Sequence, residues 1–197
     1  AEDKACYYDG SGWVYDPDPL SAAAALYGEG EFSDNSDMNN DSLEAYLKQV
    51  TLENITVDNG RYSLTGPYAS IIDGEEPYTG LYIRDSSDFH FTRDMEEFEA
   101  VNIYYHLNQS MAYINDSLGF DIMPFQYPGG VQFDPHGLNG DQNAHFLPST
   151  GWVAFGSPTS YVDAGEDHAI VIHELGHGLH SWITMGSLSQ VDGLSEG

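Results

Sequence analysis

The first half of the chain alternates apolar and polar residues with the period of two that is typical of β-strands. Four stretches combine this alternation with β-branched or aromatic residues: 12–15, 46–57, 61–72 and 89–92. The turn Asp58-Asn59-Gly60 separates two of them, and Asn-Gly tolerates the positive φ angles of a tight hairpin. Residues 1–93 are therefore predicted to form a β-rich N-terminal domain.

After Asp94 the apolar residues recur at steps of three and four, which indicates an amphipathic helix. The residues of this stripe are Val101, Tyr104, Leu107, Met111, Ile114 and Leu118. We expect Asp94 to cap the helix, Glu97 to follow as the third-position acid, and Gly119 to end it. Extended segments at 130–134 and 152–155 come next.

A second helix is predicted over residues 164–185, with Asp163 as its cap, Glu166 near its positive end and Gly186 at its exit. Strands and helices in this order indicate an α+β fold, with a second domain over residues 94–197.

The chain has 32 acidic and 5 basic residues, a formal net charge of −27. Such a charge repels nucleic acids and anionic membranes, so neither is an expected partner. The acidic residues are spread along the chain, which favours a solvated surface, and calcium binding, for example by the polar loop 31–42, is a further candidate use. No apolar run is long enough for a membrane span, and the first residues lack a signal-peptide pattern.

The strongest chemical signal is His173-Glu174-Leu175-Gly176-His177 within the second predicted helix. Residues four apart lie one turn above each other, so the two imidazoles can bind one zinc ion at about 2.0–2.1 Å. Glu174 then lies beside the open coordination position, where it can take a proton from water as the general base.

A catalytic zinc needs a third protein ligand. His180 is seven residues from His173, about 10.5 Å along the helix axis, too far for both to reach one ion. The metzincin pattern would require Gly at position 180 and His at position 183, where this chain has His180 and Ile183. Glu196, nineteen residues after His177, is the remaining candidate.

HELGH with a distal Glu resembles the thermolysin-type zinc peptidases (gluzincins), and residues 193–197 are most similar to bacterial fungalysin-like secreted peptidases. The resemblance implies the zincin-like N-terminal half of a thermolysin-type catalytic domain, with His173, His177 and Glu196 as zinc ligands. The stretch 143–146 resembles the edge strand of that family, which implies that Asn143 and Ala144 bind the substrate backbone. His106 and His136 are interpreted as structural histidines.

The family also uses a later tyrosine and a later histidine to stabilise the oxyanion, and this chain has neither after His180. We therefore expect a helical C-terminal segment, absent from the chain, as a partner that completes the cleft. The resemblance implies a secreted, extracellular zinc endopeptidase that acts on peptides or proteins. An aminopeptidase is the alternative among enzymes, and a non-catalytic surface or filament protein with a structural metal site is the alternative outside them.

Overall fold

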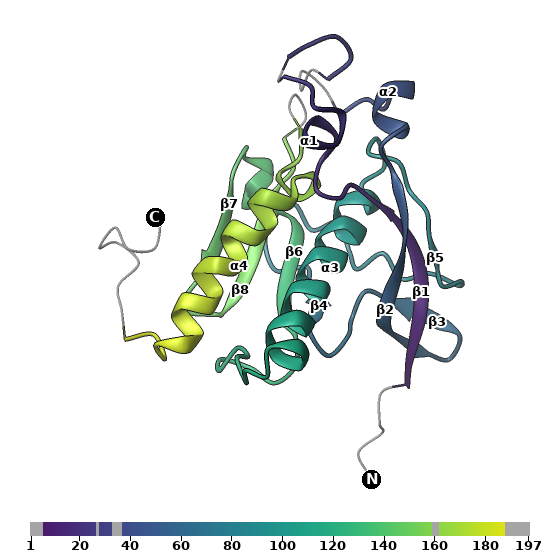
Figure 1. Cartoon of the computed structure of the whole chain (residues 1–197). Helices are drawn as coiled ribbons and strands as arrows, with labels where there is room; N and C mark the ends of the chain where they lie inside the picture. The colour runs from purple at the N-terminus through teal and green to yellow at the C-terminus, as the bar shows by residue number, and fades with distance from the viewer. Residues whose placement is uncertain (1–5, 27, 33–36, 159–161, 188–197) are drawn as a thin grey trace.

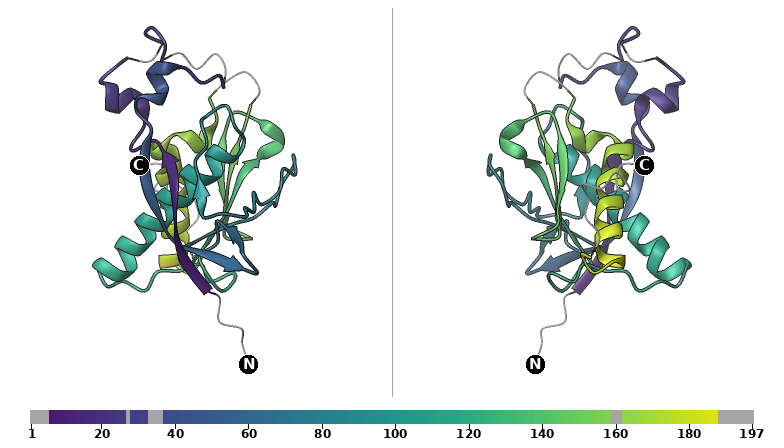
Figure 2. Two further views of the ribbon diagram at one scale, coloured as in Figure 1. Left: turned by 90° about the vertical axis from the view of Figure 1, so that its right-hand side faces the viewer. Right: turned by 90° about the vertical axis from the view of Figure 1, so that its left-hand side faces the viewer.

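The computed structural model describes residues 6–26, 28–32, 37–158 and 162–187, and these form a mixed α+β structure. Two four-stranded sheets lie on either side of the long helix α3 (Glu97–Ala112), and the helix α4 (His168–Ile183) packs against the second sheet (Figure 1). The predicted α+β class is confirmed. Two short helices, α1 (Pro19–Ala23) and α2 (Asp41–Glu44), lie together at one end of the molecule in every view (Figure 2).

The first sheet has the strand order β3-β2-β1-β5. Its strands are β1 (Cys6–Val14), β2 (Lys48–Asp58), β3 (Arg61–Ser63) and β5 (Asp88–Phe89). Asn59 and Gly60 connect β2 to β3 with φ angles of 49° and 76°, so the predicted hairpin is confirmed. The strand expected at 89–92 is reduced to two residues, which pair with β1 in the parallel direction.

The second sheet has the order β4-β6-β8-β7 and is parallel except for its last pair. Its strands are β4 (Ala69–Ile71), β6 (Val131–Gly137), β8 (Trp152–Gly156) and β7 (Ala144–Leu147), with a short 3-10 turn (Leu138–Gly140) after β6. Strand β7 forms one edge of this sheet and runs antiparallel to β8.

The single strand expected over 61–72 is divided between the two sheets, so that prediction was wrong in its extent. The break falls at Gly66-Pro67, where Gly66 N–H donates to the carbonyl of Ala69 in a turn. Proline lacks the N–H that a continuous ladder would need. A side chain at position 66 would also meet the Tyr104 hydroxyl, because an added Cβ would lie 2.5 Å from it.

Both predicted long helices are present, but their starts differ from the prediction. Helix α3 begins at Glu97 without a side-chain cap, because Asp94 accepts the hydroxyl of Thr92 instead, and it continues as a π-helical turn (Tyr113–Ser117). Helix α4 begins at His168, and Asp167 caps it through the N–H of Ala169. Asp163 is therefore not the cap, and Ala164–Glu166 form a separate 3-10 turn.

The two sheets share one hydrophobic core, in which α3 contributes to both sides. The largest fully buried side chains come from β1 and its flank, α3 and the second sheet, among them Tyr15, Phe98, Tyr104, Phe133 and Phe155. Strand β4, from the first predicted domain, pairs with β6, from the second. The division of the chain at residue 93 stays a prediction. Within the described residues, no helix has the length and apolar character to cross a bilayer.

Candidate active site

Helix α4 carries two of the predicted zinc ligands and the predicted base, and it is anchored at both ends. Asp167 accepts the Ala169 N–H at 2.7 Å and fixes the first turn, while the Gly186 N–H donates to the Ser181 carbonyl beyond the last turn. Leu175 and Trp182 bury one face of the helix in the core. This packing fixes the direction in which the opposite face points.

His173 and His177 lie on adjacent turns of α4 with their Nε2 atoms 3.1 Å apart. Their ring centroids are 4.7 Å apart and the rings are perpendicular, at 89°. Two nitrogen ligands about 2.05 Å from a tetrahedral ion are separated by roughly 3.3 Å. The two imidazoles therefore already have the spacing that one zinc ion requires, which fits the predicted ligand pair.

Glu174 lies between the two histidines in sequence and is 94% buried, with 6% of its surface exposed. Together with His173 it lines a cavity of about 740 Å³. A carboxylate at the wall of such a cavity is placed to exchange a proton with a bound water or substrate.

The structure describes the positions of some of the other predicted site residues but not of all of them. Glu196, the expected third ligand, lies outside the described residues. His180 lies on the last turn of α4, where its carbonyl accepts the N–H and hydroxyl of Thr184. Asn143 and Ala144 line the same cavity as His173 and Glu174, so the structure brings the predicted base and the predicted substrate-binding pair together.

Strand β7 reaches the cavity at Ala144, and the directions of its main-chain groups follow from its pairing with β8. The Asn143 carbonyl accepts the Gly156 N–H on the β8 side at 2.8 Å. Main-chain groups alternate along an antiparallel strand, so those of Ala144 and Phe146 point away from β8. An edge strand with outward N–H and C=O groups can accept an extended peptide as a further strand.

Further lining residues of the cavity come from the N-terminal half of the chain and from the 3-10 turn before α4. Leu20 of α1, Leu43 of α2 and Phe32 supply apolar surface, while Arg93 and Glu166 supply charge. The sequence does not connect these residues with the site, because none belongs to a recognisable motif and Leu20, Phe32 and Leu43 lie 130 or more positions from His173.

Arg93 and Glu166 form a buried ion pair beside the cavity. The guanidinium donates through Nε and Nη2 to the Glu166 carboxylate, with closest distances of 3.0 Å. Burial raises the pKa of Glu166 above its ordinary value, and the charge of Arg93 opposes that increase. Glu166 was expected near the positive end of α4, and it lies in the 3-10 turn directly before that helix, with its carboxylate bonded to Arg93.

His136 and His106 are buried and bonded to main-chain groups, as expected for structural histidines. His136 Nε2 lies 2.6 Å from the Glu96 carbonyl, and His106 Nε2 lies 2.8 Å from the Tyr15 carbonyl. Desolvation lowers the pKa of both imidazoles, that of His106 to about 4. His106 is therefore held as a neutral donor at neutral pH.

Comparison with known proteins adds no identification: no protein-family model matches the chain, and no curated protein matches its sequence.

Proposed function

We propose that this chain is a secreted zinc endopeptidase, with His173, His177 and Glu196 as metal ligands and Glu174 as the general base. The observation that carries the proposal is the 3.1 Å spacing of the two Nε2 atoms on α4, beside a cavity whose wall includes the β7 edge strand. The resemblance to thermolysin-type peptidases supplies the third ligand and the secreted location.

The substrate would lie along β7 as an added strand. The outward main-chain groups of Ala144 would pair with the peptide backbone, and the Asn143 amide would bind a further carbonyl or N–H. This arrangement recognises an extended backbone without requiring a free amino terminus, which favours an endopeptidase over an aminopeptidase.

Zinc, when bound, supplies a Lewis acid that polarises the scissile carbonyl and makes water more acidic. Glu174 accepts the proton of the attacking water and then donates it to the leaving amine. Glu174 is suited to this transfer because it lines the cavity in which the water and the substrate would bind.

Replacement Glu174→Gln tests the mechanism, since the amide keeps the shape of the side chain but cannot accept the proton. We expect peptide hydrolysis to fall by about 10²–10⁴-fold while the zinc content is unchanged. Glu44→Gln, an exposed acid on α2, is the matched control and should keep full activity. Full activity in Glu174→Gln would exclude this residue as the base.

Two measurements separate the proposal from its alternatives. Equal cleavage of N-blocked and free peptides is expected for an endopeptidase, whereas a requirement for a free amino terminus would indicate an aminopeptidase. X-ray absorption of the zinc-loaded protein should give three protein ligands and one exchangeable oxygen. Four protein ligands would indicate a structural site.

A further inference from the structure

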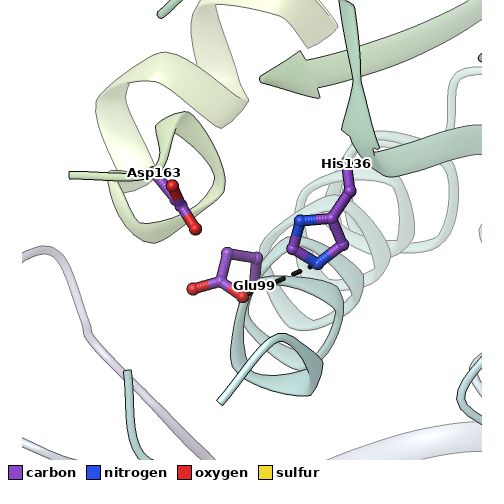
Figure 3. A group of neighbouring side chains, drawn as sticks. All are labelled: Glu99, His136 and Asp163. Atoms are coloured by element: carbon purple, nitrogen blue, oxygen red, sulfur yellow. Dashed lines mark ion pairs between the residues drawn. The ribbon is translucent and has the colours of Figure 1, made fainter. Parts of the chain in front are cut away.

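Four carboxylates gather near the start of α4, next to the cavity that His173 and Glu174 also line. We call Asp37, Glu99, Asp163 and Glu166 the acidic cluster. Glu99, Asp163 and Glu166 are at most 5% exposed, and Asp37 is half-buried. Figure 3 shows the Glu99 carboxylate, from α3, reaching into the space between Asp163 and His136.

The positive charge beside the acidic cluster is much smaller than its negative charge. Arg93 contacts Glu166 at 3.0 Å and approaches Asp37 at 3.8 Å. The other described basic side chains interact elsewhere: Lys48 with Asp16, Arg61 with Asp85, and Arg84 with the ring of Phe91. Four ionised carboxylates against one guanidinium would leave three uncompensated negative charges in the interior, which is strongly unfavourable.

Glu99 is the member of the acidic cluster whose charge has the least compensation. It is 0% exposed, and neither of its carboxylate oxygens has a hydrogen-bond partner among the described residues. Its nearest charged neighbour is His136, whose Nε2 lies 3.8 Å away and donates to the Glu96 carbonyl instead. A fully buried carboxylate without a hydrogen bond is rare in folded proteins and indicates a missing partner.

The geometry of the cluster suits a cation bound by oxygen atoms. One oxygen each of Asp37, Glu99 and Glu166 lies within 4.8 Å of the others, and Glu99 and Asp163 are equally close. Ca²⁺ binds oxygen at about 2.3–2.6 Å, so two of its ligands can be up to about 5 Å apart. His136 is excluded as a ligand, because both of its ring nitrogens have partners, Glu96 and Ser157.

We propose that the acidic cluster binds one calcium ion, with the Glu99 carboxylate as its central ligand. All its members offer hard oxygen atoms, which favour Ca²⁺ over zinc, and the irregular spacing suits calcium better than the strict octahedron of Mg²⁺. Arg93, Asp163 and Glu166 also line the cavity, so the ion can enter from that side.

Bound calcium would join three segments that are distant in sequence. Glu99 belongs to α3, Asp163 and Glu166 precede α4, and Asp37 belongs to the polar loop before α2. The Asn102 amide already ties this region together, since it donates to the carbonyls of Gly165 and Glu166. The ion would therefore fix the start of α4 relative to α3.

Protons are the competing source of positive charge. Burial raises the pKa of Asp163 to about 7 and that of Glu99 well above its usual range. A cluster neutralised by protons would not respond to calcium, so the two cases are distinguishable by experiment.

The test is thermal unfolding of the zinc-loaded protein at pH 7.5, first in buffer freed of calcium by a chelating resin and then resupplied with zinc, and again after calcium addition, together with calorimetric titration of Ca²⁺. We expect one calcium ion per chain at this site and an increase in the unfolding midpoint of about 5–10 °C when calcium is at about one hundred times Kd. Mg²⁺ at the same concentration should give a smaller increase.

Glu99→Gln should abolish both the titration signal and the increase, whereas Glu97→Gln, two residues earlier on α3, should keep both. If Glu99→Gln fails to fold, Asp163→Asn is the second variant and should weaken calcium binding at least tenfold. No calcium response in the wild type, or an unchanged response in folded Glu99→Gln, would overturn the proposal. Neither result depends on peptidase activity.

Discussion

The Arg93 guanidinium and the Glu166 carboxylate form a two-point ion pair at 3.0 Å between side chains that are 2% and 4% exposed. The pair joins the segment before α3 to the 3-10 turn before α4, across 73 positions of sequence. It thus connects the two halves of the chain next to the candidate active site.

Replacing Arg93 with Met should destabilise the protein by about 3–5 kcal/mol, because Glu166 and its acidic neighbours would lose their buried counter-charge. Unfolding in urea measures this change. Arg61→Met is the matched control, since Arg61 pairs with Asp85 at the surface, where both side chains are more than half exposed. Its effect should stay below about 1 kcal/mol. Equal effects of the two variants would contradict the role assigned to Arg93.

Gly176→Ala should stabilise the protein by about 0.8–1 kcal/mol, because alanine favours the helical backbone more than glycine does. An added Cβ at this position meets no described atom within 4 Å. Gly178→Ala, two residues later on α4, is the contrasting variant. There the Cβ would lie 2.7 Å from the Trp182 ring, so this variant should be destabilised. Thermal unfolding of the two variants distinguishes these effects, and a loss of stability in Gly176→Ala would show that its surroundings are closed.

Asn143→Ala should lower kcat/KM for peptide hydrolysis by roughly tenfold, the usual effect of losing one hydrogen bond to a bound backbone. The zinc content should not change, because Asn143 lies just before β7 and not on α4. Gln109→Ala, an amide on α3 outside the cavity lining, serves as the control. Unchanged kinetics in Asn143→Ala would remove this side chain from the proposed substrate contacts.

The pH dependence of stability should include a contribution from His106. Its folded pKa of about 4 lies below the ordinary value of 6.5, because burial disfavours the charged imidazole. Between these values the unfolded chain binds the proton more readily, so the contribution is intact above pH 6.5 and is lost as the pH falls to 4.

The loss amounts to about 3 kcal/mol for 2.5 pKa units. His106→Gln lacks this titration, so its stability should fall less than that of the wild type between pH 7 and pH 4. Urea unfolding at several pH values gives both profiles. Parallel profiles would mean that His106 titrates normally in the folded protein.

Local signals predicted the parts of the structure that depend on neighbouring residues. Asn59-Gly60 specified the hairpin because only a few residues accept its φ angles, and the spacing of His173 and His177 specified two converging imidazoles. The edge position of β7 followed from the resemblance of 143–146 to a family segment, and the structure places that strand at the edge of its sheet.

Features that depend on distant contacts were not predictable in this way. Asp163 and Asp94 both precede a helix, yet Asp163 accepts the Ser157 hydroxyl and Asp94 that of Thr92, so neither caps. Their sequence positions cannot reveal these competing partners. The acidic cluster escaped notice for the same reason, since its members are ordinary acids in sequence and become unusual only when folding buries them together.

Helix α3 buries eleven of its sixteen residues between the two sheets, whereas β7 is a single edge strand of the second sheet. The amide protons of α3 should therefore exchange with solvent only when the whole molecule opens, and those at the outer side of β7 through small local fluctuations. Resistance to opening would be greatest at the centre of the molecule and least along the strand proposed to receive a peptide. The protein would then combine a rigid central helix, α3, with an edge strand, β7, whose backbone can adjust to a bound peptide.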